Sequence, residues 1–113
     1  MIELNLVKKE CVPCKGGVPP LKGKELEPLY QQLHNDWKLI DEHHLKRDFK
    51  FDDFEKALVF TNEIGALAER EGHHPDFELG YGYVNIATYT HKIDGLTESD
   101  FILAAKIDQI AGT

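Results

Sequence analysis

The sequence lacks long apolar runs and any excess of positive charge. No stretch approaches the roughly 20 apolar residues that a membrane-spanning helix needs. Residues 1–5 also lack the basic-then-apolar order that is typical of a signal peptide. Thirteen basic residues against 20 acidic ones give a net charge of -7, which repels phosphate backbones and anionic lipids. The sequence therefore predicts a soluble, cytoplasmic protein that binds neither nucleic acid nor membranes.

The composition is that of a single globular domain. Hydrophobic residues make up 42% and charged residues 29%, which excludes collagen-like, coiled-coil and disordered chains. A length of 113 residues is enough for one compact domain and too short for two of ordinary size. Residues 1–23 are rich in proline and glycine, whereas regular patterns begin at residue 24. We therefore expect an irregular N-terminal arm over 1–23 and one domain over 24–113.

The sequence is poor in cysteine, and both cysteines lie in this arm. Cys11 and Cys14 have the spacing of a redox pair or of half a zinc site. A redox pair favours a helix after its first thiol, but the prolines and glycines at 13–20 prevent one. A structural zinc site needs four ligands, and only His34 or the pair at 43–44 could complete it if the fold placed them there. We interpret the cysteines as free thiols in a docked arm, with redox catalysis and metal binding as open alternatives.

Hydrophobic periodicity predicts helices and strands in alternating groups. Helical spacing of apolar residues predicts helices over 24–34, from residue 54 to Gly72, and over 98–111. Alternating or β-branched runs predict strands over 37–41, 45–51, 77–79 and 83–91. Because short links join the paired strands, we expect an α+β fold. It consists of a four-stranded antiparallel sheet with three helices packed on one face, in the order helix-strand-strand-helix-strand-strand-helix.

The helix ends carry clear signals. Asp52 or Asp53 is the expected N-cap of the second helix and Gly72 its end. Thr97 is expected to cap the last helix, with Asp100 at the position of a capping-box carboxylate. The apolar stripe of the second helix is predicted to comprise Phe54, Ala57, Leu58, Thr61, Ile64, Leu67 and Ala68.

Three histidines form a candidate site. His73 and His74 lie at a helix-to-strand junction, because Pro75 disfavours helix in the residue before it. His91 is expected to end the long strand, where it could meet the other two in one cleft. Imidazoles, with an unperturbed pKa of about 6.5, can give or take protons near neutral pH. The spacing leaves open acid/base catalysis, metal binding, or a polar helix cap and a solvated strand end. The histidines at 43–44 are interpreted as hairpin residues without function.

A longer set of residues resembles the pterin-4a-carbinolamine dehydratase family over about residues 22–111. The shared pattern is an acidic residue four before His-His-Pro, then an aromatic residue, a second histidine after the next strand, and an aspartate in the last helix. Here the matching segments are Glu69–Phe77, Tyr81, Val84–Ile86, Thr90–His91 and Gly95–Phe101. Trp37 also matches the tryptophan usual in the family, whereas the cysteine arm lies outside the common core.

The resemblance implies a hydro-lyase that uses no metal or organic cofactor. Family members dehydrate 4a-hydroxytetrahydropterin, which aromatic amino-acid hydroxylases leave behind, to quinonoid dihydropterin, and so support recycling of the tetrahydropterin. The resemblance assigns catalysis to His73, His74 and His91. We expect His73 and His91 to be the acid/base pair, and His74 to orient or assist.

The resemblance also indicates three substrate-binding residues. Trp37 would stack on the pterin or belong to the core. Glu69 would orient a histidine or lie on the exposed face of its helix. Asp100 matches the family pattern, although capping alone would explain it.

We also expect the chain to form oligomers, and two alternative functions stay open. The family forms dimers and tetramers, and an open antiparallel sheet has edges to cover, so we expect a homodimer or homotetramer. Animal members also bind a homeodomain transcription factor as a dimerisation cofactor, so a non-catalytic protein-binding role on the same fold is one alternative. A small metalloprotein that uses the three histidines with the cysteine pair is the other.

Overall fold

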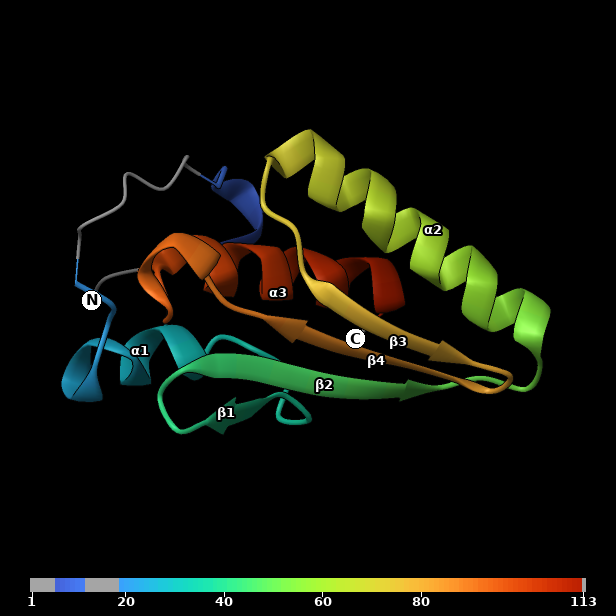
Figure 1. Ribbon diagram of the computed structural model, residues 1–113, viewed down its shortest axis with the longest axis horizontal. Coiled ribbons are helices and arrows are strands. Elements are labelled where there is room, and N and C mark those ends of the chain that lie inside the picture. Colours follow the sequence, from blue (N-terminus) through green and yellow to red (C-terminus); the bar gives the residue numbers. More distant parts are fainter. Residues whose placement is uncertain (1–5, 12–18, 113) are drawn as a thin grey trace.

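The computed structural model describes residues 6–11 and 19–112 (Figure 1). The elements follow the predicted order. The helices and strands are α1 (Glu27–Tyr30), β1 (Lys38–Ile40), β2 (His44–Lys50), α2 (Phe54–Glu71), β3 (Asp76–Gly80), β4 (Tyr83–Thr88) and α3 (Glu98–Ala111). Three 3-10 turns accompany them, namely η1 (Leu6–Lys8), η2 (Gly23–Glu25) and η3 (His91–Ile93). Within the described residues, no helix combines the length and apolarity needed to cross a membrane.

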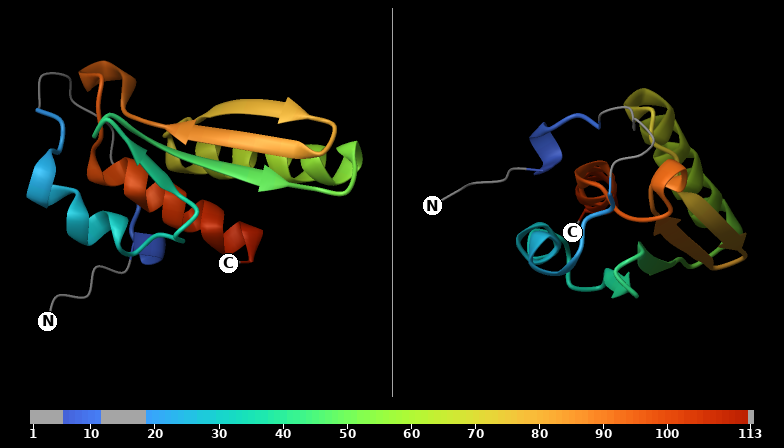
Figure 2. Two further views of the ribbon diagram at one scale, coloured as in Figure 1. Left: turned by 90° about the horizontal axis from the view of Figure 1, so that it is seen from below. Right: turned by 60° about the vertical axis from the view of Figure 1, so that its left-hand side comes forward.

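The sheet has four antiparallel strands in the order β1-β2-β4-β3. The central pair runs in register from Leu45 opposite Thr88 to Lys50 opposite Tyr83. The helices lie on one side of the sheet, as the two views of Figure 2 show. The predicted α+β architecture is therefore confirmed.

The pleat of β2 and β4 separates a core face from an outer face. Leu45, Arg47 and Phe49 of β2 are buried, and so are the side chains of β4 at positions 84, 86 and 88. The residues between them are exposed or half-buried. This alternation is what a sheet covered on one side requires, and it is the pattern that the sequence predicted.

The β1–β2 hairpin turns without the usual Asn-Gly pair. Asp41 and Glu42 adopt left-handed backbone angles, with φ of 52° and 56°. The amide of His43 donates to the carbonyl of Ile40 at 2.8 Å and closes the turn. Two consecutive residues with positive φ are typical of the type I′ turn, whose twist matches that of the strands. Aspartate tolerates this conformation because its short polar side chain can bond locally.

Two predicted elements differ at their ends. The first helix was expected over 24–34, but α1 spans only Glu27–Tyr30, preceded by the turn η2. The chain enters η2 through Gly23 with φ of 53°, and Pro28 marks the first turn of α1. The strand expected over 83–91 ends at Thr88, because Thr90 pairs with Gly95 instead and the chain turns at η3.

The long helix is capped as predicted, but its buried stripe is shifted. The Asp53 carboxylate accepts from the amide of Lys56 at 2.9 Å, and Gly72 ends the helix with φ of 67°. Phe54 and Leu58 were expected in the apolar stripe, but both are exposed. The buried residues are Ala57, Phe60, Ile64, Leu67 and Ala68. Phe60, rather than Phe54, is the phenylalanine of this helix that enters the core. The centroid of its ring lies 4.7 Å from that of Phe49 on the sheet.

A buried polar cluster joins α3 to β2 and to the segment before β1. Asp108 of α3 accepts from the indole nitrogen of Trp37 at 2.7 Å and from the Arg47 guanidinium at 2.5 Å. It also accepts from the backbone amide of His34 at 3.1 Å. Because the Trp37 and Arg47 side chains are buried, the carboxylate satisfies polar groups that water does not reach.

We expect Asp108→Ala to destabilise the fold by about 3–5 kcal/mol, because it leaves the Arg47 guanidinium buried without this partner. Urea unfolding measures this loss. Lys56→Ala is the control, since it removes an ion pair to Asp52 at the surface and should leave the midpoint unchanged. Equal midpoints for the two variants would contradict the role given to the buried cluster.

Candidate active site

The end of α2 places two histidines. Gly72 adopts the left-handed conformation, and its amide and that of His73 both donate to the carbonyl of Ala68. This cap turns the chain away from the helix axis. Pro75 then separates His74 from the start of β3. The junction predicted from Pro75 therefore holds both imidazoles at the C-terminal end of α2.

A small loop places the third histidine. Beyond β4, the amide of Thr90 donates to the carbonyl of Gly95 at 2.7 Å, and the amide of Gly95 returns a bond at 3.4 Å. The residues between them form η3, which begins at His91. His91 thus does not end the strand, as was expected, but opens the 3-10 turn that follows it.

The three histidines line one pocket of about 280 Å³. The remaining lining residues come from the same two junctions, and they are Gly72, Tyr89, Thr90 and Lys92. The sequence indicated that the imidazoles could converge, but it assigned no role to Tyr89 or Lys92. The signal in the sequence is their closeness to His91, since Lys92 follows it directly and Tyr89 lies two residues before it.

Each imidazole lies beside a carboxylate. The pairs, measured from Nε2 to the nearest carboxylate oxygen, are His73–Asp100 at 2.6 Å, His74–Glu69 at 2.5 Å and His91–Asp76 at 3.8 Å. The His73 side chain is 11% exposed, whereas those of His74 and His91 are 62% and 56% exposed. The site therefore combines one anchored, nearly buried imidazole with two that are open to solvent.

Asp100 is fully buried and accepts four hydrogen bonds. One oxygen accepts from His73 and from the Thr88 hydroxyl at 2.8 Å, and the other from the Thr90 hydroxyl at 2.8 Å and the Thr97 amide at 3.0 Å. When this carboxylate is ionised it can only accept, and Nε2 of His73 is then the ring nitrogen that carries a proton. Nδ1 is then the nitrogen of His73 that remains for chemistry.

The expected substrate-binding residues have different positions. Trp37 does not line the pocket, because its ring is fully buried in the core and its indole nitrogen donates to Asp108. Of the two roles expected for Trp37, this burial favours the core role over stacking on a substrate. Asp100 caps α3 through Thr97 and contacts two residues that line the pocket, His73 and Thr90. Glu69 is exposed beside His74. Asp76, beside His91, was not singled out, although it directly follows the His-His-Pro motif.

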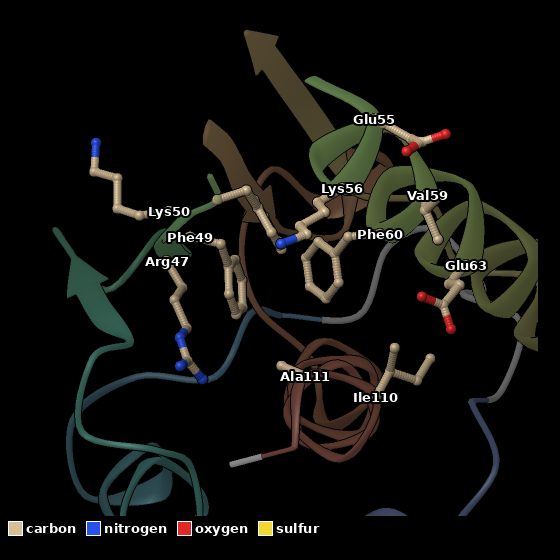
Figure 3. Close-up of a pocket in the computed structure, with 11 residues that line it drawn as sticks. Arg47, Phe49, Lys50, Glu55, Lys56, Val59, Phe60, Glu63, Ile110 and Ala111 are labelled. Carbon is tan, nitrogen blue, oxygen red and sulfur yellow. The ribbon is translucent and has the colours of Figure 1, made fainter. Parts of the chain in front are cut away.

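A second, larger pocket of about 490 Å³ lies beside the N-terminal half of α2 (Figure 3). Phe49 and Phe60 point into it, and Ile110 and Ala111 of α3 form its opposite wall. No histidine lines this cavity. It offers apolar surface and charged rims but none of the acid/base groups of the smaller pocket.

Cys11, in the described part of the N-terminal arm, contacts the end of α2 and the start of α3. The Cys11 amide donates to Glu71 at 3.0 Å, and its thiol donates to the carbonyl of Ser99 at 3.4 Å. Glu71 in turn pairs with Lys106 at 2.6 Å. Burial, and then the Glu71 charge, raises the pKa of the Cys11 thiol to about 12. A thiol held protonated is a poor nucleophile and a poor metal ligand. Cys14 lies outside the described residues.

Residues 19–110 match the family described as Pterin 4 alpha carbinolamine dehydratase. The chain belongs to this family. The resemblance drawn from the histidine motif is therefore confirmed. A relative from Rubrobacter xylanophilus, named "Putative pterin-4-alpha-carbinolamine dehydratase", is 60% identical over 94% of this chain and 98% of its own. One from Alkaliphilus metalliredigens with the same name is 56% identical over 93% and 95%.

Two solved structures are also similar. The first is a transcriptional coactivator/pterin dehydratase from Brucella melitensis, with a TM-score of 0.75 and 33% identity over 82% of this chain and 99% of that one. The second is a pterin dehydratase-like protein identified as a RuBisCO assembly factor in the alpha-carboxysome. Its TM-score is 0.60, with 28% identity over 71% of this chain and 94% of that one. The descriptions of these two structures thus include a coactivator/pterin dehydratase and an assembly factor.

We expect Cys11 to resist alkylation in the folded protein at about pH 8, because its raised pKa leaves little thiolate. Iodoacetamide labelling followed by peptide mass analysis measures the extent at Cys11. The same protein in denaturant is the control and should label rapidly. Rapid labelling of Cys11 in the native protein would contradict the docked, protonated thiol.

Proposed function

We propose that this protein dehydrates 4a-hydroxytetrahydropterin to quinonoid dihydropterin by histidine acid/base catalysis. The reaction would support tetrahydropterin recycling after aromatic amino-acid hydroxylation. The observation that carries the proposal is the convergence of His73, His74 and His91 on one pocket in a chain of the dehydratase family. The carboxylate beside each imidazole adds support, because such partners orient the ring.

The reaction needs both an acid and a base. Hydroxide is a poor leaving group from carbon 4a, so an acid must protonate it while the carbon–oxygen bond breaks. The neighbouring ring nitrogen supplies the electron pair, and water departs. A base then takes a proton from the pterin ring. Imidazoles can perform both transfers near neutral pH, and each such transfer contributes roughly a hundredfold to ten-thousandfold in rate.

The environments of the histidines suggest how the roles divide. Asp100 holds the proton on Nε2 of His73, so Nδ1 is available as the base. His91 is open to solvent, so its proton is renewed from water and it serves as the acid. His74 lies against Glu69 at the rim and orients the substrate or assists the transfer.

A binding role on the same fold is the second candidate, because similar structures include a coactivator and an assembly factor. A protein that only binds a partner has no need of three imidazoles in one pocket, which favours catalysis. Association into a homodimer or homotetramer stays a prediction, and light scattering would measure it. The exposed apolar side chains of Phe54, Leu58 and Val59 on α2 are a surface that such association would cover.

We expect chelator-treated wild-type protein to dehydrate freshly generated 4a-hydroxytetrahydropterin. His73→Ala and His91→Ala should each lower kcat by about a hundredfold to ten-thousandfold, because each removes one proton transfer. The absorbance change on forming the quinonoid product measures the rate.

The control for these variants is His34→Ala, since His34 does not line the pocket and its loss should leave the rate unchanged. Activity that appears only after zinc is returned would favour the metalloprotein alternative. A wild-type protein that is inactive with and without zinc would contradict the proposal and favour the binding role.

We expect Asp100→Asn to lower kcat by about a hundredfold or more while the protein stays folded. The amide would offer a donor to Nε2 of His73 and so move the ring proton to Nδ1, as happens when a triad aspartate is replaced. Its remaining oxygen can still accept from the Thr97 amide. Asp53→Asn is the matched control, because it changes the cap of α2 instead. Equal activity of the two variants would contradict a tautomer-setting role for Asp100.

A further inference from the structure

A histidine from the first hairpin lies against the proposed active site. His43 stands at the β1–β2 turn, and its ring centroid is 4.6 Å from that of Tyr89. The ring of Tyr89 is in turn 4.3 Å from that of His91. Figure 2 shows this turn beside the orange η3 segment, although the two are far apart in the sequence. The three rings therefore form a continuous row of tilted ring contacts that ends at a pocket histidine.

The same hairpin is tied to the loop that carries His91. Nε2 of His43 lies 2.7 Å from a carboxylate oxygen of Asp94. The amide of Asp94 donates to the carbonyl of His91 at 3.2 Å and closes η3. The contacts thus run in a closed circuit from His91 through Tyr89, His43 and Asp94 back to the His91 backbone.

The His43 ring is held at its second nitrogen as well. Nδ1 of His43 lies 3.1 Å from Nδ1 of His44, and the two rings meet edge to face at 5.3 Å. Burial, and then the neighbouring His43, lowers the pKa of His44. A neutral His44 ring can pair with either protonation state of its neighbour. Contacts at both nitrogens therefore set the plane of the His43 ring.

His91 needs such support more than the other two histidines do. His73 and His74 each have a carboxylate within hydrogen-bond distance, whereas Nε2 of His91 is 3.8 Å from Asp76. That separation is too long for a direct hydrogen bond. The described contact that defines the plane of the His91 ring is its packing on Tyr89.

We propose that His43 is a positioning residue, which acts through the Tyr89 ring and the Asp94 carboxylate to hold His91 in the pocket. Its value for catalysis rests on the proposed function, while its effect on the His91 ring does not. A misplaced acid loses much of its effect, because proton transfer depends on near-contact geometry. His43 thus gains a functional role, whereas the sequence predicted it only as part of a hairpin.

Three variants test the proposal. His43→Ala removes the ring, and His43→Phe keeps a ring against Tyr89 without the bond to Asp94. His34→Ala is the matched control, since the side chains of His34 and His43 are 31% and 32% exposed and each lies beside an aspartate. The first readout is the NMR signal of the His91 imidazole, which the Tyr89 ring current displaces. The second is the separate measurement of kcat and KM.

We expect His43→Ala to shift the His91 signal and to lower kcat roughly tenfold with little change in KM. His43→Phe should restore most of the His91 signal position and of kcat. His34→Ala should change neither the signal nor kcat. The His73 signal is an internal reference and should stay in place, because Asp100 holds that ring independently.

Three results would overturn the proposal. They are an unchanged His91 signal in His43→Ala, equal effects of His43→Ala and His43→Phe, and a simultaneous shift of His73, which would show a general structural loss. A shifted His91 signal in a protein without dehydratase activity would support the positioning role and overturn the proposed function alone.

Discussion

The buried carboxylate of Asp100 is the constraint on which the site depends. It caps α3 through the Thr97 amide, fixes the end of β4 through two threonine hydroxyls, and holds the imidazole of His73. A buried charge is tolerated only when its oxygens are satisfied. The hydrogen bonds that satisfy this buried carboxylate therefore also hold three segments together. They are the start of α3, the end of β4 and the end of α2.

This arrangement makes the three histidines chemically unlike one another. His73 is anchored from behind by a group that water does not reach, whereas His74 and His91 meet solvent-exposed carboxylates. A fixed tautomer suits a base, and an open ring that exchanges with water suits an acid. The difference comes from burial and partners alone, since the residue type is the same. The acid and base roles proposed for these histidines rest on this difference, which the sequence motif does not show.

Local patterns accounted for most of the elements and their ends. The N-cap at Asp53, the stop at Gly72 and the capping box at Thr97 are local hydrogen-bond signals, so they could be found without the fold. The stripe of α2 could not, because the packing of Phe60 on Phe49 decides which side of the helix is buried. The end of β4 was also missed, since Thr90 pairs with Gly95 rather than extending the sheet.

The sequence by itself determined the fold class and the family and indicated the three histidines as candidates, because periodicity and motif spacing can be read from the order of residues along the chain. Only the tertiary structure decided what each side chain meets. It placed Trp37 in the core, since a buried indole needs an acceptor and Asp108 supplies one. It also brought His43 to Tyr89 and Asp76 to His91, contacts between segments whose separation along the chain carries no signal. Partners across a fold depend on packing, and packing is a property of the whole chain.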